Sequence, residues 1–331
     1  MGGDRAPQIV IEGAEIIASS INNINFLLFG DATKINPIVV RCPYLKSCCQ
    51  IIHTSDFISG DEKPSNALRR GTKSSMRLAI DAVKNHDADV AISAGNTGAL
   101  MAMAKIVLRP LEKITRPAIV TSIPNQKNSG TIFLDMGANI DCDPNILYQF
   151  AVMGYAFAKI VKHIDNPKIG ILNVGSEDLK GNNQVKEVAE LLKNSHLSDN
   201  FYGYVEGDDI TKGTVDIVVT DGFCGNITLK AIEGTAKMVA SYVKLGFMSS
   251  FLAKIGYLFA GHSIKEATKI MDPRNHNGAM FIGLNGIVVK SHGSTDNIGF
   301  ANAIKVAISL VENDINQKII KELENIQINH I

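Results

Sequence analysis

Short apolar segments recur along the chain, and a glycine-containing turn and a helical pattern follow each one. The apolar segments occupy residues 89–93, 131–135, 168–174 and 215–220. Apolar runs of this length between turn signals are typical of strands that are buried on both faces. Residues with helical periodicity follow at 99–113, 145–161, 183–195 and 227–243. Asp143 and Pro144 are placed to cap and open the second of these helices.

This alternation predicts an α/β protein in which helices cover both faces of a parallel sheet, a three-layer αβα arrangement. Ligands of such sheets bind beyond the carboxyl ends of the strands. We therefore expect the four glycine-containing turns to lie together along one edge of the sheet.

The segment 238–260 is strongly apolar but does not follow this alternation. Two lysines and two glycines interrupt it: Lys244, Lys254, Gly246 and Gly256. The pattern predicts an apolar helical hairpin at about 238–262, with bends at the glycines, inserted into a single domain that spans 1–331. Two interpretations stay open, a pair of buried helices and a hairpin at a membrane interface with its lysines at the headgroups.

Composition narrows the classes of protein that remain. Hydrophobic residues make up 45% of the 331 residues and charged residues 20%, as in ordinary globular proteins. Lys plus Arg equals Asp plus Glu at 33 each, so no net charge indicates a nucleic-acid partner. The five cysteines are an odd number in a long chain, which favours a reducing compartment over a disulfide framework. Neither a signal peptide nor a membrane-spanning segment is predicted.

The turn Ser-Ala-Gly-Asn-Thr-Gly at 93–98 would place unpaired backbone amides and two polar side chains at the start of a helix. Such a position suits an anion, because the amides have no partner within the helix and the helix dipole is positive there. The candidate ligands are Ser93, Gly95, Asn96, Thr97 and Gly98. A tight turn that binds nothing would have the same sequence.

The other turns carry further polar side chains. The candidates are Ser176, Lys180, Gly181 and Asn182 in the turn at 175–182, Asp221, Gly225 and Asn226 at 221–226, Asp135 and Asn139 at 135–139, and Lys290, His292, Ser294 and Asp296 near the carboxyl end. A lysine in such a turn can reach a phosphate or an oxyanion. The alternatives are an exposed loop lysine, an aspartate that caps the next helix, and a structural histidine.

Several chemistries have no support in the sequence. It contains no Gly-x-Ser-x-Gly, no His-Glu-x-x-His and no Gly-x-Gly-x-x-Gly after a strand, so we expect neither a serine hydrolase, a catalytic metal nor an ordinary dinucleotide dehydrogenase. Cys224 could form a thioester, but with no evident histidine partner we expect a small apolar filler. Segment 68–77 holds four cations and no carboxylate, as a solvated helix face or as a docking patch: Arg69, Arg70, Lys73 and Arg77.

Taken together, these motifs resemble the phosphate acyltransferase family of bacterial phospholipid synthesis. The matching stretches run in order along nearly the whole chain: GGDRAP (2–7), KPSNALRRGTKSSM (63–76), SAGNTGALMA (93–102), RPAIVTSIP (116–124), LDMGANIDCDP (134–144), QFAVMG (149–154), LNVGSEDLKGN (172–182), VEGDDI (205–210), DGFCGNITLKAIEG (221–234) and GLNGIVVKSHGSTD (283–296).

The resemblance implies a fold similar to those of isocitrate/isopropylmalate dehydrogenases and of phosphotransacetylase. It implies a cytoplasmic homodimer associated peripherally with the membrane. It also implies transfer of a long acyl chain from acyl carrier protein to inorganic phosphate, without a cofactor. The acyl phosphate would feed a membrane glycerol-3-phosphate acyltransferase. Family members usually begin with an apolar strand ending in Asp-Ala-Met-Gly-Gly-Asp, and this sequence starts at that Met, so either the start lies upstream or the strand is missing.

Phosphate is itself a nucleophile, so the hypothesis needs no acylated side chain, only proximity and a stabilised oxyanion. We expect the turn at 93–98 to hold phosphate and Lys180 to supply positive charge. Asn182 and Asn226 would donate hydrogen bonds, and Asp221 or His292 would orient phosphate or move its proton. Three alternatives stay open: a phosphotransacetylase that uses coenzyme A, a dehydrogenase on the shared fold, and a membrane-associated scaffold without activity.

Overall fold

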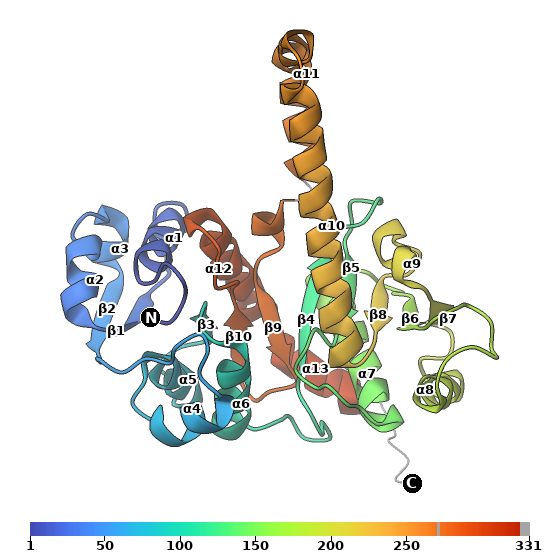
Figure 1. The fold of residues 1–331 in the computed structure, drawn as a ribbon. Helices are drawn as coiled ribbons and strands as arrows, with labels where there is room; N and C mark the ends of the chain where they lie inside the picture. The colour runs from blue at the N-terminus through green and yellow to red at the C-terminus, as the bar shows by residue number, and fades with distance from the viewer. Residues whose placement is uncertain (270–271, 325–331) are drawn as a thin grey trace.

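The central sheet organises the molecule (Figure 1). The computed structural model describes residues 1–269 and 272–324. Within them the main sheet has eight strands in the order β3-β10-β9-β4-β5-β8-β6-β7. From one side to the other these are β3 (Val90–Ser93), β10 (Ile287–Lys290), β9 (Ala279–Ile282), β4 (Ala118–Ile123), β5 (Thr131–Leu134), β8 (Ile217–Val219), β6 (Ile169–Leu172) and β7 (Phe201–Val205).

Helices cover both faces of this sheet, which confirms the three-layer α/β prediction. One face packs against α7 (Pro144–Val161), α8 (Asn183–Lys193), α12 (Asn297–Glu312) and α13 (Ile315–Glu324). The other face packs against α4 (Pro64–Arg70), α5 (Ser75–Lys84), α6 (Thr97–Leu108) and α9 (Gly207–Lys212). Neighbouring strand residues such as Ile132 and Phe133 are both fully buried but join opposite clusters, because side chains alternate between the faces of a strand.

A smaller unit precedes the main sheet in the chain. The parallel pair β1 (Phe26–Gly30) and β2 (Cys49–His53) lies with α1 (Gln8–Ala18), α2 (Ala32–Val39) and α3 (Pro43–Ser47). Its apolar residues form a separate cluster that includes Phe300, Ala301 and Ile304 of α12. Packing against α12 holds the start of the chain beside the carboxyl end of β10. There the backbone N–H of Asp4 donates to Gly293 O at 3.1 Å.

The sheet is mostly parallel, as predicted, but two strands have only antiparallel neighbours. β9 is antiparallel to both β10 and β4, and β4 is antiparallel to β5, whereas β3–β10, β5–β8, β8–β6 and β6–β7 are parallel. The connections explain this, because residues 124–130 join β4 to β5 and residues 283–286 join β9 to β10. Such short connections permit only antiparallel pairs.

The reversal also overturns the expectation that the glycine-containing turns share one edge. β3 and β10 end at one edge, which we call the His292 edge, and it carries the turns 93–98 and 291–296. β5, β8 and β6 run the other way and end at the opposite edge, the Asn226 edge, which carries the turns 135–139, 175–182 and 221–226. The two sets of candidate residues therefore lie at opposite ends of the strands.

A helical hairpin projects far from the body of the molecule (Figure 1). It consists of α10 (Gly222–Met248) and α11 (Phe251–Lys269), and the short helix η1 (Pro273–His276) follows. The helix pair thus begins well before residue 238, and it turns at Ser249 and Ser250 instead of at Gly246 or Gly256, both of which lie inside helices.

The interpretation of this segment as a pair of buried helices is wrong for the single chain. Leu252, Leu258 and Phe259 are 78%, 80% and 84% exposed, so the apolar side chains of the hairpin point into solvent. No helix among the described residues is both long and apolar enough to cross a membrane.

Candidate active site

Helix α10 connects the two edges of the sheet. It starts at the Asn226 edge, packs Leu229 and Ile232 against the core, and reaches the His292 edge at Glu233. Asn226, Lys230, Glu233 and Lys237 are spaced four, three and four residues apart and so lie on one side of the helix, which we call the polar face of α10. At about 1.5 Å per residue this face is about 17 Å long.

At the His292 edge, three segments that are distant in sequence meet. Ser291 N donates to Ser93 O at 2.9 Å, which joins the ends of β10 and β3. The His292 imidazole lies with Nδ1 3.2 Å from Ser294 Oγ and Nε2 3.9 Å from Glu233 Oε1. Glu233 in turn accepts a hydrogen bond from Lys230 Nζ at 2.9 Å. The imidazole is thus flanked by a hydroxyl on its own turn and by a carboxylate on α10.

Charged groups at this edge have perturbed acidities. The pKa of Lys290 is lowered to about 8, mainly by burial and less by the positive charge of Lys230, while Asp4 opposes the shift. Burial also lowers the pKa of His292, with Lys230, Lys290 and Lys237 adding to the shift and Glu233 opposing it. The imidazole is therefore neutral at pH 7 and can accept a proton. Such perturbed groups are typical of functional sites.

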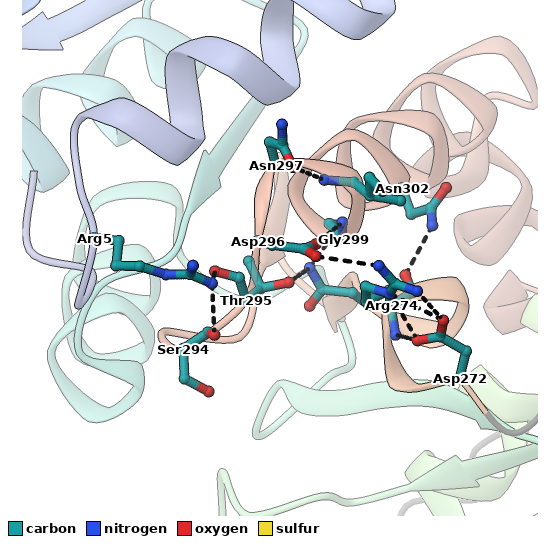
Figure 2. A network of polar contacts seen from close by, with 11 residues as sticks. Arg5, Asp272, Arg274, Ser294, Thr295, Asp296, Asn297, Gly299 and Asn302 are labelled. Carbon is teal, nitrogen blue, oxygen red and sulfur yellow. Dashed lines mark hydrogen bonds and ion pairs between the residues drawn. The ribbon is translucent and has the colours of Figure 1, made fainter. Parts of the chain in front are cut away.

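Polar contacts hold the turn that carries His292 from several sides (Figure 2). Arg5 donates to Thr295 O at 2.8 Å, and Arg274 pairs with Asp296 at 3.3 Å and with Asp272 at 2.6 Å. Asn277 accepts from His292 N at 2.8 Å. The backbone on which His292 sits is therefore fixed by side chains from outside the turn.

The turn at 93–98 uses much of its polar capacity for its own structure. Asn96 caps α6 by accepting from Ala99 N at 2.9 Å, and its amide donates to Gly60 O and Glu62 O, each at 2.9 Å. Ser93 Oγ accepts from Gly95 N at 3.1 Å. Of the predicted anion ligands, Thr97 and Gly98 keep first-turn amides that have no partner within the helix.

At the Asn226 edge, a buried carboxylate organises two of the turns. Asp135 is fully buried and accepts hydrogen bonds from five N–H groups, on Ile119, Gly137, Ala138 and, twice, Asn139. Burial raises the pKa of Asp135, and these donors oppose the rise. The Asn139 amide also donates to Pro117 O at 2.8 Å. Asn139 therefore serves as part of the scaffold at this edge, and its role as a substrate ligand stays a prediction.

Gly225 permits the close packing of these turns. A Cβ at this position would lie 1.8 Å from Asp135 O, so no other residue fits. The same packing places Asn226 against the backbone of Gly137, with the Asn226 side chain exposed on the polar face of α10.

The remaining candidates at this edge are caps or exposed loop residues. Asp221 caps α10 by accepting from Cys224 N at 2.7 Å, and Asn182 caps α8 by accepting from Val185 N at 2.9 Å. Lys180 is 53% exposed and lies 3.7 Å from Glu177, and Ser176 and Gly181 lie in the same loop. Cys224 is exposed instead of filling the core, and burial together with Asp221 raises the pKa of its thiol, which disfavours a covalent thiolate role.

Comparison with known proteins places the chain in a family. The family model described as "Fatty acid synthesis protein" matches residues 1–318. A phosphate acyltransferase from Paramagnetospirillum magneticum is 53% identical over 99% of this chain and 93% of the relative. One from Rhodospirillum centenum is 51% identical over 99% of this chain and 92% of the relative. The chain belongs to the phosphate acyltransferase family.

As a member of this family the chain is an acyltransferase of fatty acid and lipid synthesis. Among solved structures it is similar in fold to a phosphotransacetylase from Streptococcus pyogenes, with a TM-score of 0.55 and 16% identity over 93% of this chain and 99% of the other. It is also similar to a branched-chain phosphotransacylase from Enterococcus faecalis, with a TM-score of 0.56 and 14% identity over 94% and 97%. At these identities the likeness concerns the fold alone.

The basic segment of this acyltransferase lies around the junction of α4 and α5. Arg69, Arg70 and Lys73 are exposed, whereas Arg77 donates to Asp81 at 2.9 Å and 3.1 Å. The cationic surface therefore consists of three side chains instead of the four that were predicted.

The sequence interpretation missed Lys230 and Glu233, and it named Lys290 without assigning it a role. Lys230 lies one helical turn from Asn226, and Glu233 one turn further. This spacing was the signal that could have identified them. The sequence analysis named candidates only in the turn at 221–226 and none in the helix that follows it.

Proposed function

We propose that this acyltransferase transfers a long acyl chain from acyl carrier protein to inorganic phosphate, giving acyl phosphate for phosphatidic acid synthesis. The observation that carries the proposal is the polar face of α10, a continuous row of hydrogen-bonding and cationic groups in a chain about half identical to phosphate acyltransferases. Its cations would attract an anion, and the Asn226 amide would donate to an acyl thioester. The enzyme would need no cofactor.

The reaction is balanced by the substrates themselves. An oxygen of HPO₄²⁻ bonds to the thioester carbonyl carbon, the carbon–sulfur bond then breaks, and the phosphate proton ends on the departing thiol. His292, neutral at pH 7 and flanked by Ser294, would carry that proton. Asn226 would donate to the oxyanion, and the α10 amino end would favour its charge.

The proposed roles of three other residues follow their positions. Lys180 would swing from its exposed loop toward the oxyanion, since a half-exposed lysine 3.7 Å from one glutamate keeps its freedom. Asp221 and Asn182 would act indirectly as helix caps. The amides of Thr97 and Gly98 would face phosphate from the β3 side.

Three surfaces would bring in the partners. Arg69, Arg70 and Lys73 would dock the acidic carrier protein. The exposed apolar tip of the hairpin would contact a membrane interface, or a second copy in a homodimer, and would release acyl phosphate near a membrane glycerol-3-phosphate acyltransferase. These assignments would make the enzyme a cytoplasmic protein bound to the membrane periphery.

The test mixes the pure enzyme with palmitoyl-acyl carrier protein, with and without phosphate, and measures free carrier thiol together with acyl phosphate trapped by hydroxylamine. We expect both products only with phosphate. Lys180→Ala and Asn226→Ala should each lower kcat about 100-fold, the usual effect of losing one oxyanion donor, with Lys105→Ala as the exposed-lysine control. Preference for acetyl coenzyme A would instead indicate a phosphotransacetylase, and binding without turnover a scaffold.

A further inference from the structure

Cations from two elements converge at the His292 edge. On α10, Lys230 lies 2.9 Å from Glu233, whose carboxylate lies 3.9 Å from the His292 imidazole. Lys290 ends β10 two residues before His292. Lys230, Lys290 and Lys237 each contribute to lowering the pKa of His292. The carboxylates that face them are Glu233, which pairs with Lys230 and lies near Nε2, and Asp4, which acts on Lys290. Three lysines thus stand against two carboxylates, and the imidazole can add a fourth positive charge.

We propose that Lys230, Lys290 and His292 form the subsite that binds the attacking phosphate. This inference rests on the proposed function. It adds Lys230 to two candidates of the sequence analysis, His292 and Lys290, and gives all three one shared ligand. Its ligand is a phosphoryl dianion, and inorganic phosphate is the form that the reaction requires.

Lys290 is the central observation. Its ammonium group is half-buried and donates to Ser291 O, the neighbouring carbonyl, and it makes no ion pair with any carboxylate in the described part of the chain. Asp4 acts on it only from beyond ion-pair distance, and a desolvated cation without a close counter-ion is unfavourable. A dianion beside it would compensate both this burial and the repulsion from Lys230.

Lys230 is placed to share that ligand with the reaction centre. Glu233 orients it at 2.9 Å, and its charge acts on both Lys290 and His292. It lies four residues from Asn226, a rise of about 6 Å along the helix. Phosphate bound at Lys230 would therefore share the polar face of α10 with Asn226, the proposed oxyanion donor.

Binding should also change protonation. A dianion next to His292 favours its charged form and raises its pKa, and the same holds for Lys290. Phosphate binding should therefore take up protons near pH 8, where Lys290 of the free enzyme is half-charged. The affinity for the phosphate dianion should fall as pH rises above 8.

The experiment measures the binding of inorganic phosphate to the full chain by calorimetry, without acyl donor. We expect Lys230→Met and Lys290→Met each to weaken binding at least 10-fold, whereas Lys105→Met, which removes an exposed charge from α6, should leave it unchanged. Thermal melts establish that each variant is folded, and the exposed Lys230 keeps the test available if Lys290→Met does not fold.

Lys290→Arg supplies a readout that a merely structural lysine would not move. Lys290→Arg should retain phosphate binding. Its affinity for the phosphate dianion should no longer fall above pH 8, because arginine does not titrate there. Unchanged affinity in both methionine variants would overturn the subsite, as would an unchanged pH profile in Lys290→Arg.

These outcomes separate the subsite from the proposed function. If the methionine variants turn over with a normal KM for phosphate, the subsite proposal is wrong and the proposed reaction stands. If phosphate binding depends on the lysines but no acyl phosphate forms, the subsite proposal stands and the proposed reaction is wrong. A wild-type chain that neither binds phosphate nor responds to it in turnover would remove both.

Discussion

The two edges of the central sheet carry similar polar residues but use them in opposite ways. At the Asn226 edge, the Asp135 carboxylate accepts five hydrogen bonds and Asn139 donates two, so the buried polar groups there are satisfied within the fold. At the His292 edge, Lys290 and His292 keep unsatisfied charge capacity and shifted pKa values. Buried groups whose hydrogen bonds are all made within the fold are rigid, whereas a buried group without such partners is stabilised when a ligand binds.

The comparison also explains why turn motifs are ambiguous. Asn96, Asn182 and Asp221 each lie in or beside a glycine-containing turn that follows a strand, as a ligand would, yet each caps the next helix. Capping and anion binding compete for the same first-turn amides. A polar residue at this position therefore predicts a helix start more reliably than it predicts a ligand.

The largest expected effect tests how closely the Asn226 edge is packed. Gly225→Ala places a Cβ 1.8 Å from Asp135 O, which forces the backbone to move. We expect the free energy of unfolding to fall by about 3 kcal/mol, as for severe overpacking, in urea melts. Gly234→Ala is the matched control in the same helix, because no atom lies within 4 Å of its Cβ, and it should add about 0.5–1 kcal/mol. Equal effects of the two variants would show that this edge is loosely packed.

The next prediction concerns the uncompensated cation at the His292 edge. The pKa of Lys290 is lower in the folded protein than in the unfolded chain, so below pH 8 the folded state carries the full penalty of the buried charge. Lys290→Met should therefore raise the unfolding free energy at pH 7 by about 2–3 kcal/mol.

The pH dependence gives the sign of this effect. Between pH 8 and about 10.5 the unfolded chain binds more protons at Lys290, so the wild type gains stability as pH rises and the advantage of Lys290→Met should shrink. Denaturant melts at pH 7 and pH 10 measure both values. A variant that is less stable than wild type at pH 7 would mean that Lys290 is already compensated within the fold.

A smaller effect is expected where α10 continues beyond the His292 edge. Leu252→Glu at the hairpin tip should weaken binding to anionic liposomes about 10-fold or more, because one large apolar side chain contributes about 1.5–3 kcal/mol on burial. Val174→Glu, at 77% exposure on the body, is the control and should have no effect. Sedimentation with vesicles measures both. Equal binding would exclude the tip as the contact and leave the second copy as its partner.

The smallest effect is expected at the basic surface, which touches neither edge. Arg69→Ala with Arg70→Ala should raise KM for acyl carrier protein several-fold and leave kcat unchanged, since exposed ion pairs contribute about 0.5–1 kcal/mol each. The difference should vanish in 0.5 M salt, where such charges are screened. Arg41→Ala, an exposed arginine elsewhere, controls for net charge. A salt-independent defect would place these arginines in another role.

Much of the fold could be predicted from the sequence because the relevant signals are local. The strands at 90–93, 131–134, 169–172 and 217–219 coincide with continuous apolar segments, and Asp143 caps α7 as expected. The hairpin was placed correctly as a helix pair but its turn was not, because glycine lowers helix stability by only about 1 kcal/mol and the serines at 249–250 take the turn.

The candidate site was predicted less well because it depends on contacts between distant segments. Asn226 and the turn at 93–98 were named and expected on one edge, and His292 was named without being assigned to an edge. The separation of Asn226 from the turn at 93–98 follows from two strands with only antiparallel neighbours, β4 and β9, and the sequence analysis identified neither of them as a strand. In the sequence, Lys230 resembles an ordinary solvated helix residue. Only its electrostatic action on Lys290 in the folded chain makes it a candidate phosphate ligand.

The sequence by itself determined the strands, the helix caps and the family, because apolar runs, capping residues and motif order are properties of neighbours in the chain. The tertiary structure decided which turns share an edge, that Asp135 is enclosed by N–H donors, and that the Lys290 ammonium is half-buried beside another lysine. Strand direction, burial and electrostatic coupling arise from residues that are far apart in the chain and meet only when the core packs.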